Sequence, residues 1–126
     1  MQYLHNTYSK SIKNKIENDT DFFIGLSSFS LEGIGKAKDL GIVAIIDHGS
    51  IHLEVEKEIL TNEFDKFGID KRHMYQADSW IVTKENEEFK TADYILLGSE
   101  FAKETFIKKG FDSEKLLVNN YGVDLT

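Results

Sequence analysis

Apolar residues along the chain follow two alternating patterns, one typical of short strands and the other of amphipathic helices. Runs of three to five apolar residues bounded by turn signals predict strands at 22–26, 42–46, 94–97 and 116–118. Apolar positions three or four residues apart predict helices at 8–17, 31–40, 53–67, 81–90 and 99–110. The segment 69–80 fits neither pattern clearly.

Two of these segments carry a specific expectation about burial. The strand 22–26 is apolar without alternation, which is typical of a strand covered on both faces, as in a parallel sheet. In the first helix, Tyr8, Ile12 and Ile16 share one face, so we expect that face to pack against the rest of the domain.

The ends and the polar faces of the later helices can also be predicted. Ser99 stands where a helix N-cap is needed, and Gly110 stands where the same helix should end. We expect the acidic group Glu85, Glu87 and Glu88 to form the solvated face of its helix.

The order of the segments gives the fold class. Strands that alternate with helices imply right-handed crossover connections and a parallel sheet. The sequence therefore predicts an α/β fold with a Rossmann-like, doubly wound parallel sheet of about four strands. The length of 126 residues fits one such domain, spanning 1–126.

Composition and net charge limit the kinds of binding partner and chemical site that the chain can have. The chain has 22 acidic and 15 basic residues and a net charge of -7, so we expect no nucleic-acid partner and at most peripheral membrane contact. It has no cysteine, which excludes a disulfide framework, a thiolate metal site and a cysteine nucleophile. Without an apolar run of roughly 20 residues or an apolar leader at the start, a cytoplasmic location is expected.

The best candidate for chemistry is the loop predicted to follow strand 42–46. Ligands of open α/β sheets bind beyond the carboxyl ends of the strands. This loop holds a carboxylate, two imidazoles, a hydroxyl and a glycine that permits close approach of a ligand, namely Asp47, His48, Gly49, Ser50 and His52. The alternative is a polar connection in which Ser50 or His52 only caps the following helix.

A metal site is not expected in this loop. His48 and His52 are four positions apart, but a pair at that spacing binds a metal when both members lie on one face of a helix. Here Gly49 lies between them and the helix is only beginning.

Three stretches, taken in order, resemble glycosyltransferase family 4. They read "GIGKAKDLGIVAIIDHGSIH", "EILTNEFDKFGI" and "TKENEEFKTADYILLGSEFAKETFIKKGFDSEKLLVNNYGVDL". The last carries most of the resemblance, with an Ala-Asp pair, a strand ending at a serine, a helix, a glycine and a final Gly-Val-Asp. The resemblance covers residues 20–125 and corresponds to the second half of the amino-terminal domain in these two-domain, GT-B type enzymes.

The resemblance implies a function for the chain and also which part of such an enzyme the chain corresponds to. In this family the amino-terminal domain mainly holds the acceptor, the carboxy-terminal domain binds the nucleotide sugar, and Gly122-Val123-Asp124 would lie at the join. The chain is therefore expected to be a fragment of a retaining nucleotide-sugar-dependent glycosyltransferase, without the donor-binding domain and inactive alone. The alternative is a non-catalytic α/β module that binds a sugar or a phosphate.

The resemblance also suggests roles and partners. His48 is the match for a catalytic histidine near the reaction centre, although His52 fits a Ser-x-His variant, so both stay candidates. Asp47, Gly49 and Ser50, with His52, would bind substrate. Expected partners are a carbohydrate or glycolipid acceptor and either the missing domains or a second copy, covering an unpaired apolar edge at 22–26. No cofactor is expected beyond the nucleotide-sugar donor.

Overall fold

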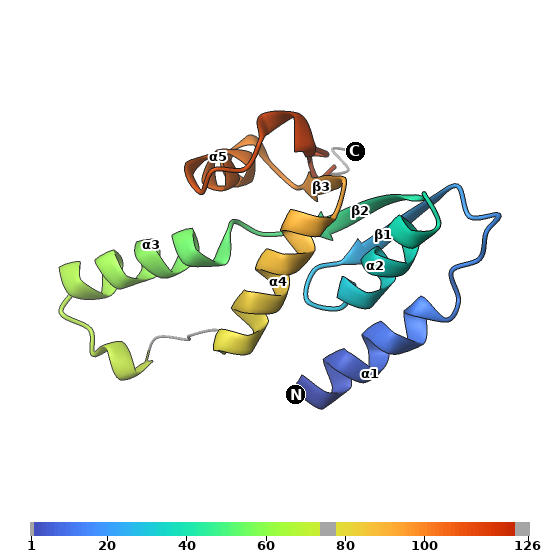
Figure 1. The fold of residues 1–126 in the computed structure, drawn as a ribbon. Helices are drawn as coiled ribbons and strands as arrows, with labels where there is room; N and C mark the ends of the chain where they lie inside the picture. The colour runs from blue at the N-terminus through green and yellow to red at the C-terminus, as the bar shows by residue number, and fades with distance from the viewer. Residues whose placement is uncertain (1, 74–77, 123–126) are drawn as a thin grey trace.

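A computed structural model describes residues 2–73 and 78–122, which form a parallel sheet with helices packed against it (Figure 1). The strands are β1 (Phe22–Leu26), β2 (Val43–His48), β3 (Tyr94–Leu97) and β4 (Leu116–Val118). The helices are α1 (Gln2–Lys13), α2 (Leu31–Asp39), α3 (Leu53–Lys66), α4 (Ser79–Thr91) and α5 (Glu100–Lys108), with short 3₁₀ turns at Lys71–His73 and Ser113–Lys115. Val123 and Asp124 of the predicted domain join lie outside the described residues.

The four strands are all parallel and lie in the order β1-β2-β3-β4. The predicted α/β class and the Rossmann-like sheet of about four strands are confirmed. Each crossover connects neighbouring strands, and successive crossovers move across the sheet in the same direction. This strand order is that of one half of a doubly wound sheet. No helix in the described part of the chain is long and apolar enough to cross a bilayer.

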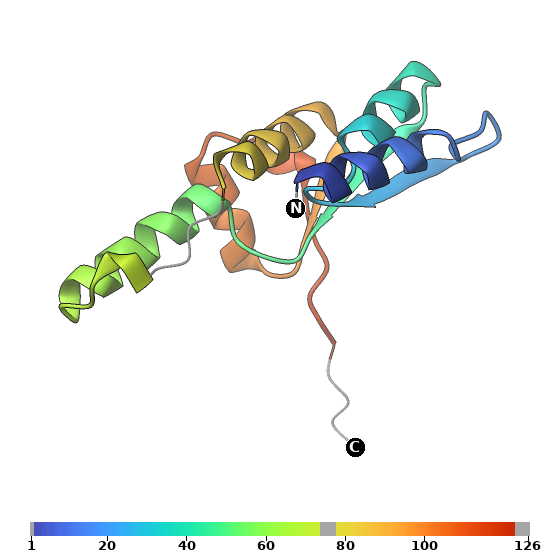
Figure 2. The ribbon, with the colours of Figure 1, turned by 90° about the horizontal axis from the view of Figure 1, so that it is seen from below.

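One face of the sheet carries the hydrophobic core. Alternate strand residues point toward α2, α4 and α5, while α1 packs on the outer side of α2. Figures 1 and 2 both show α3 projecting away from the sheet. The core is formed by Phe23, Ala44, Ile46, Ile95, Leu97 and Leu116 from the strands, with Ile34, Ala37, Phe89, Ala102 and Phe106 from the helices.

The expectation that the strand 22–26 is covered on both faces is wrong for the described part of the chain. In β1, exposed and buried residues alternate, and Phe22, Ile24 and Leu26 are 57%, 51% and 60% exposed. The register places them in line with exposed apolar residues of the neighbouring strands. We call the surface formed by Phe22, Ile24, Leu26, Val43, Tyr94 and Leu117 the open face.

The first helix buries only part of the predicted face: Ile12 and Ile16 pack against the core, whereas Tyr8 does not. It begins at Gln2 and ends at Lys13, and its fully buried residues are His5 and Ser9, whereas Tyr8 is 53% exposed. The His5 ring stacks on Phe29 with centroids 3.9 Å apart. These two polar side chains are buried because each has a partner: His5 Nδ1 lies 3.2 Å from the carbonyl oxygen of Ser28, and the Ser9 hydroxyl donates to Glu32 of α2.

The predicted helix ends are largely confirmed. Gly41, Gly68 and Gly110 follow helices with φ of 72°, 63° and 87°, a region that suits glycine because it lacks a Cβ. The hydroxyl of Ser99 accepts a hydrogen bond from the N–H of Ala102 at 3.1 Å, as expected of an N-cap.

Candidate functional site

A hollow lies at the carboxyl ends of β2 and β3. The two strands end side by side, since His48 pairs with Leu97, and the chain turns away at Gly49 and Gly98. The turns border a hollow of about 260 Å³. Its lining is Gly49, Ser50, Ile51, Gly98, Ser99, Ala102 and Tyr121. The hollow is thus at the edge where open α/β sheets bind ligands.

Glycine at both turns allows Tyr121 to lie close to the backbone. A Cβ on Gly98 would come within 2.6 Å of Tyr121 Cε2, and one on Gly49 within 2.7 Å of Tyr121 Oη. The Tyr121 hydroxyl itself lies 3.4 Å from the carbonyl oxygen of Gly49. Any side chain at Gly98 would therefore displace the tyrosine and change the shape of the hollow.

The groups that line the hollow are uncharged. Ser50 is exposed, and Ser99 caps α5, whose N-terminal end faces the hollow and carries a partial positive charge. Hydroxyls, backbone amides and one phenol can bind an oxygen-rich ligand, but none of them is a general base at neutral pH. The lining thus offers hydrogen-bonding groups but no general base.

His48 belongs to the core. It is the last residue of β2 rather than the second residue of a loop, and it is 4% exposed. Its Nδ1 lies 2.9 Å from Ser27 Oγ and its Nε2 lies 3.2 Å from the carbonyl oxygen of Ile51. Because a carbonyl only accepts, Nε2 carries a proton and donates to Ile51, while Nδ1 shares a hydrogen bond with the serine hydroxyl. Both ring nitrogens thus have partners within the chain.

His52 caps α3, as the alternative interpretation of the loop predicted. Its Nδ1 accepts a hydrogen bond from the N–H of Glu54 at 3.3 Å, and its own N–H donates to Thr105 Oγ1 at 3.0 Å. The ring is 2% exposed and makes an edge contact with Phe106 at 5.1 Å. Burial lowers the pKa of His52 below its usual 6.5, so the ring is neutral in its cap position.

The five residues of the predicted site are consequently divided among three places. Gly49 and Ser50 line the hollow, His48 and His52 lie in the core beside Phe89 and Phe106, and Asp47 is a residue of β2. Asp47 alternates with His48 and pairs with Leu26 and Leu96, so it lies on the face opposite the core. The binding and catalytic roles given to the five residues stay predictions.

Five residues of the hollow were not predicted as binding residues, namely Ile51, Gly98, Ser99, Ala102 and Tyr121. Ser99 was predicted as a helix cap only, and Gly98 and Tyr121 were not singled out. The position of the glycine directly after an apolar strand was a usable signal, because strand ends and glycine together mark the ligand edge. Tyr121 carries no local signal, since its place over the two turns depends on the path of the chain after β4.

The prediction of a solvated acidic face on α4 is wrong for Glu88 and Glu85. Glu88 is 0% exposed, and its carboxylate accepts hydrogen bonds from the backbone N–H groups of Ser28, Ser30 and Leu31 at 2.6, 2.7 and 2.9 Å. Glu85, which is 6% exposed, accepts the hydroxyl of Ser28. The two carboxylates therefore bind the loop after β1 instead of facing solvent. In this loop Ser28 has a φ of 70°.

The ionisation of Glu88 should make stability depend on pH. Burial raises its pKa from 4.5 to about 7, outweighing the backbone N–H groups and Lys84, which favour the carboxylate. The folded chain therefore holds this proton more tightly than the unfolded chain. The resulting stabilisation is fully present below pH 4.5 and is lost as the pH rises through about 7.

Urea unfolding of wild type and Glu88→Gln at pH 5 and pH 8 measures this effect. We expect the stability advantage of the wild type over the variant to fall by about 1–3 kcal/mol between the two pH values, because one pKa unit corresponds to about 1.4 kcal/mol. His52, whose lowered pKa gives the opposite slope, is present in both proteins and cancels. The exposed neighbour provides the control, as Glu87→Gln should leave the pH dependence unchanged.

Searches against protein-family models, curated proteins and solved structures found no significant match. Within residues 2–73 and 78–122, no group of three or more histidine, aspartate or glutamate side chains is arranged to hold a metal ion.

Proposed function

We propose that this chain is the acceptor-side half of a retaining, nucleotide-sugar-dependent glycosyltransferase, and that the hollow at Gly49 and Gly98 positions an acceptor hydroxyl. One observation carries the proposal: an uncharged hollow, lined by hydroxyls and backbone groups, lies at the carboxyl edge of a parallel Rossmann-like sheet. A sugar is neutral and rich in hydroxyls, so its groups match those of the hollow.

The chemistry of transfer would need groups from elsewhere. Transfer requires stabilisation of the charge on the departing diphosphate, and the lining of the hollow contains no cation to provide it. The chain would contribute positioning of the acceptor, and a donor-binding domain would contribute the nucleotide sugar. The open face supports this division, because a large exposed apolar patch marks a surface that other protein covers. A cytoplasmic location belongs to the same proposal.

A non-catalytic binding module is the second candidate. The observations that favour it are the N-terminus of α5 at the hollow, which suits an anion such as phosphate, and the engagement of both histidines within the core. The two candidates differ in the ligand that they expect. The acceptor site should bind neutral sugars, whereas a phosphate module should bind inorganic phosphate.

A titration of the ¹⁵N-labelled chain separates the two candidates. Methyl glucoside, methyl galactoside, methyl mannoside, uridine diphosphate and inorganic phosphate are added in turn, and amide shifts are recorded. We expect at least one neutral glycoside to move the amides of Gly49, Ser50, Gly98 and Ser99 at millimolar concentration. Phosphate and uridine diphosphate should leave them in place.

Two matched glycine variants test the location. Gly98→Ala should abolish the response, because its Cβ would displace Tyr121, whereas Gly35→Ala meets no atom within 4 Å and should respond as the wild type does. A response of these amides to phosphate but not to the glycosides would overturn the acceptor proposal in favour of the binding module. No response to any probe would contradict both candidates.

A further inference from the structure

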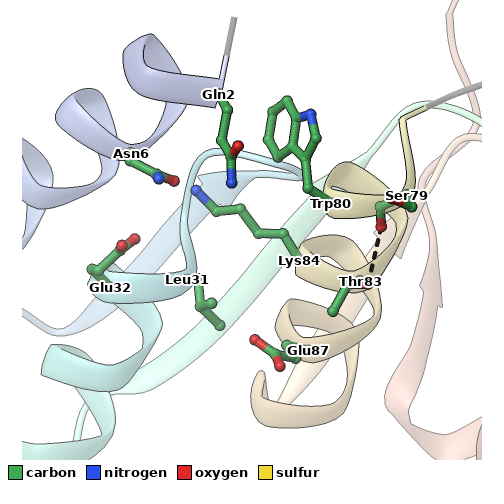
Figure 3. Close-up of a pocket in the computed structure, with 9 residues that line it drawn as sticks. All are labelled: Gln2, Asn6, Leu31, Glu32, Ser79, Trp80, Thr83, Lys84 and Glu87. Carbon is green, nitrogen blue, oxygen red and sulfur yellow. Dashed lines mark hydrogen bonds between the residues drawn. The ribbon is translucent and has the colours of Figure 1, made fainter.

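A second groove, separate from the hollow, lies between α1, the start of α2 and the start of α4 (Figure 3). Its volume is about 350 Å³, which falls within the range of about 300–1,000 Å³ typical of small-molecule sites. The lining includes amide, hydroxyl, carboxylate, ammonium and indole groups. The residues that bear on its chemistry are Gln2, Asn6, Glu32, Trp80, Lys84 and Glu87.

Lys84 is the unusual member of this groove. It is 7% exposed, and within the described part of the chain its ammonium group has no hydrogen-bond partner. Figure 3 shows its side chain running from α4 into the groove toward Gln2 of α1. A buried ammonium group without an acceptor is unfavourable, so the geometry calls for a ligand that supplies an acceptor oxygen.

The surrounding charges favour a neutral ligand over an anion. Two carboxylates, Glu32 and Glu87, line the same groove, and the buried Glu88 also feels the positive charge of Lys84. Carboxyl groups therefore outnumber the single ammonium group of the lining. An anion would be repelled by them, whereas a hydroxyl accepts from an ammonium group and donates to a carboxylate.

Trp80 provides a flat apolar wall. Its indole N–H donates to Asp78 Oδ2 at 3.1 Å, and the ring makes an edge contact with His5 at 5.2 Å and 80°. The indole is thus fixed at its polar end while its ring borders the groove (Figure 3). A rigid aromatic ring of this kind suits the C–H face of a sugar ring, which is apolar although the rim of the same ring is polar.

We propose that this groove binds a neutral pyranose sugar. Lys84 donates to a hydroxyl oxygen, Glu32 and Glu87 accept from hydroxyls, and the C–H face of the sugar lies on Trp80. The site is distinct from the hollow at Gly49 and Gly98 and does not depend on the transferase proposal. It would give the chain a second carbohydrate contact, on the side of the domain formed by α1 and α4.

The sequence provides a direct probe, because Trp80 is the only tryptophan among its 126 residues. Tryptophan emission is followed while methyl glucoside, methyl galactoside, methyl mannoside, N-acetylglucosamine and, separately, inorganic phosphate and acetate are added. We expect a saturable change with at least one neutral sugar and none with the two anions. The signal is independent of the amide shifts at Gly98, so the two sites are tested separately.

Paired lysine variants on α4 test the assignment. Lys84→Met keeps the length of the side chain but removes the donor, and we expect it to weaken binding at least tenfold. Lys90→Met makes the same change at an exposed position of the same helix and should bind as the wild type does. Circular dichroism and the emission maximum without sugar establish that each variant is folded.

If Lys84→Met does not fold, Glu32→Gln provides the second test, with an expected severalfold loss of affinity because one acceptor is weakened. Saturable binding of phosphate or acetate that Lys84→Met removes would overturn the neutral-sugar assignment. The absence of a saturable response to every sugar in the panel, or equal binding by Lys84→Met and the wild type, would overturn the site itself.

Discussion

Replacing Glu88 with alanine should destabilise the chain by about 3–5 kcal/mol, the range for mutations that leave several buried groups without partners. Three backbone N–H groups of the loop after β1 donate to this one carboxylate, and alanine would leave all of them unsatisfied. The variant would also leave a cavity beside Ser30, whose side chain is 0% exposed. Chemical denaturation with urea measures the loss.

The control lies one residue away. Glu87 is exposed on the same helix, and Glu87→Ala should change stability by no more than about 0.5 kcal/mol. Hydrogen exchange adds a local readout, since the amides of Ser28, Ser30 and Leu31 should lose protection in Glu88→Ala. A loss of less than about 1 kcal/mol, with those amides still protected, would mean that the carboxylate does not hold the loop.

The buried role of Glu88 illustrates what the sequence could and could not predict. Residue type suggested solvent exposure, because carboxylates are mostly exposed. In the structure Glu85 and Glu88 instead share the buried face of α4, since Glu85 lies four positions before Phe89 and Glu88 lies four before Ala92, and both apolar residues are buried. No local pattern reveals this burial, because the partners of the two carboxylates lie far away along the chain: backbone N–H groups for Glu88 and the Ser28 hydroxyl for Glu85.

Elements with strong local signals were predicted well. All four strands occur at or within two residues of their expected positions, because short apolar runs bounded by turns leave few alternatives. The difference between prediction and structure that matters most is the end of β2, which was expected at residue 46 and lies at His48. Pairing with β3 extends the strand through Asp47 and His48, and this extension alone sends the two side chains to opposite faces.

The open face shows a second limit of sequence patterns. An unbroken apolar strand implies that both faces avoid water, but it does not identify what covers each face. Phe22, Ile24 and Leu26 are as apolar as the residues of the core, yet they are exposed in the described part of the chain. The predicted edge is present, since β1 pairs only with β2 within the four-stranded sheet.

Removing the apolar side chains of the open face should therefore have a large effect on association. The wild-type chain presents apolar side chains over the whole sheet beside an unpaired edge strand, and both features promote self-association. The triple variant Phe22→Thr, Ile24→Thr, Leu26→Thr places β-branched residues, which suit a strand, at all three positions while reducing the apolar surface. We expect it to be a folded monomer under conditions in which the wild type associates.

A matched variant separates the open face from exposed apolar surface in general. Phe101 and Ile107 are 58% and 45% exposed on α5, away from the open face. The double variant Phe101→Ala, Ile107→Ala also removes apolar side chains but leaves the sheet unchanged. It should associate as the wild type does.

We propose that this chain acts as part of a larger assembly, with other protein over its open face, and sedimentation velocity over a range of concentrations tests this proposal. We expect the sedimentation coefficient of the wild type to rise with concentration, and the triple threonine variant to stay at the value of a 14.4 kDa monomer throughout. A wild-type chain that is well folded by circular dichroism and sediments as a monomer at every concentration would contradict the proposal.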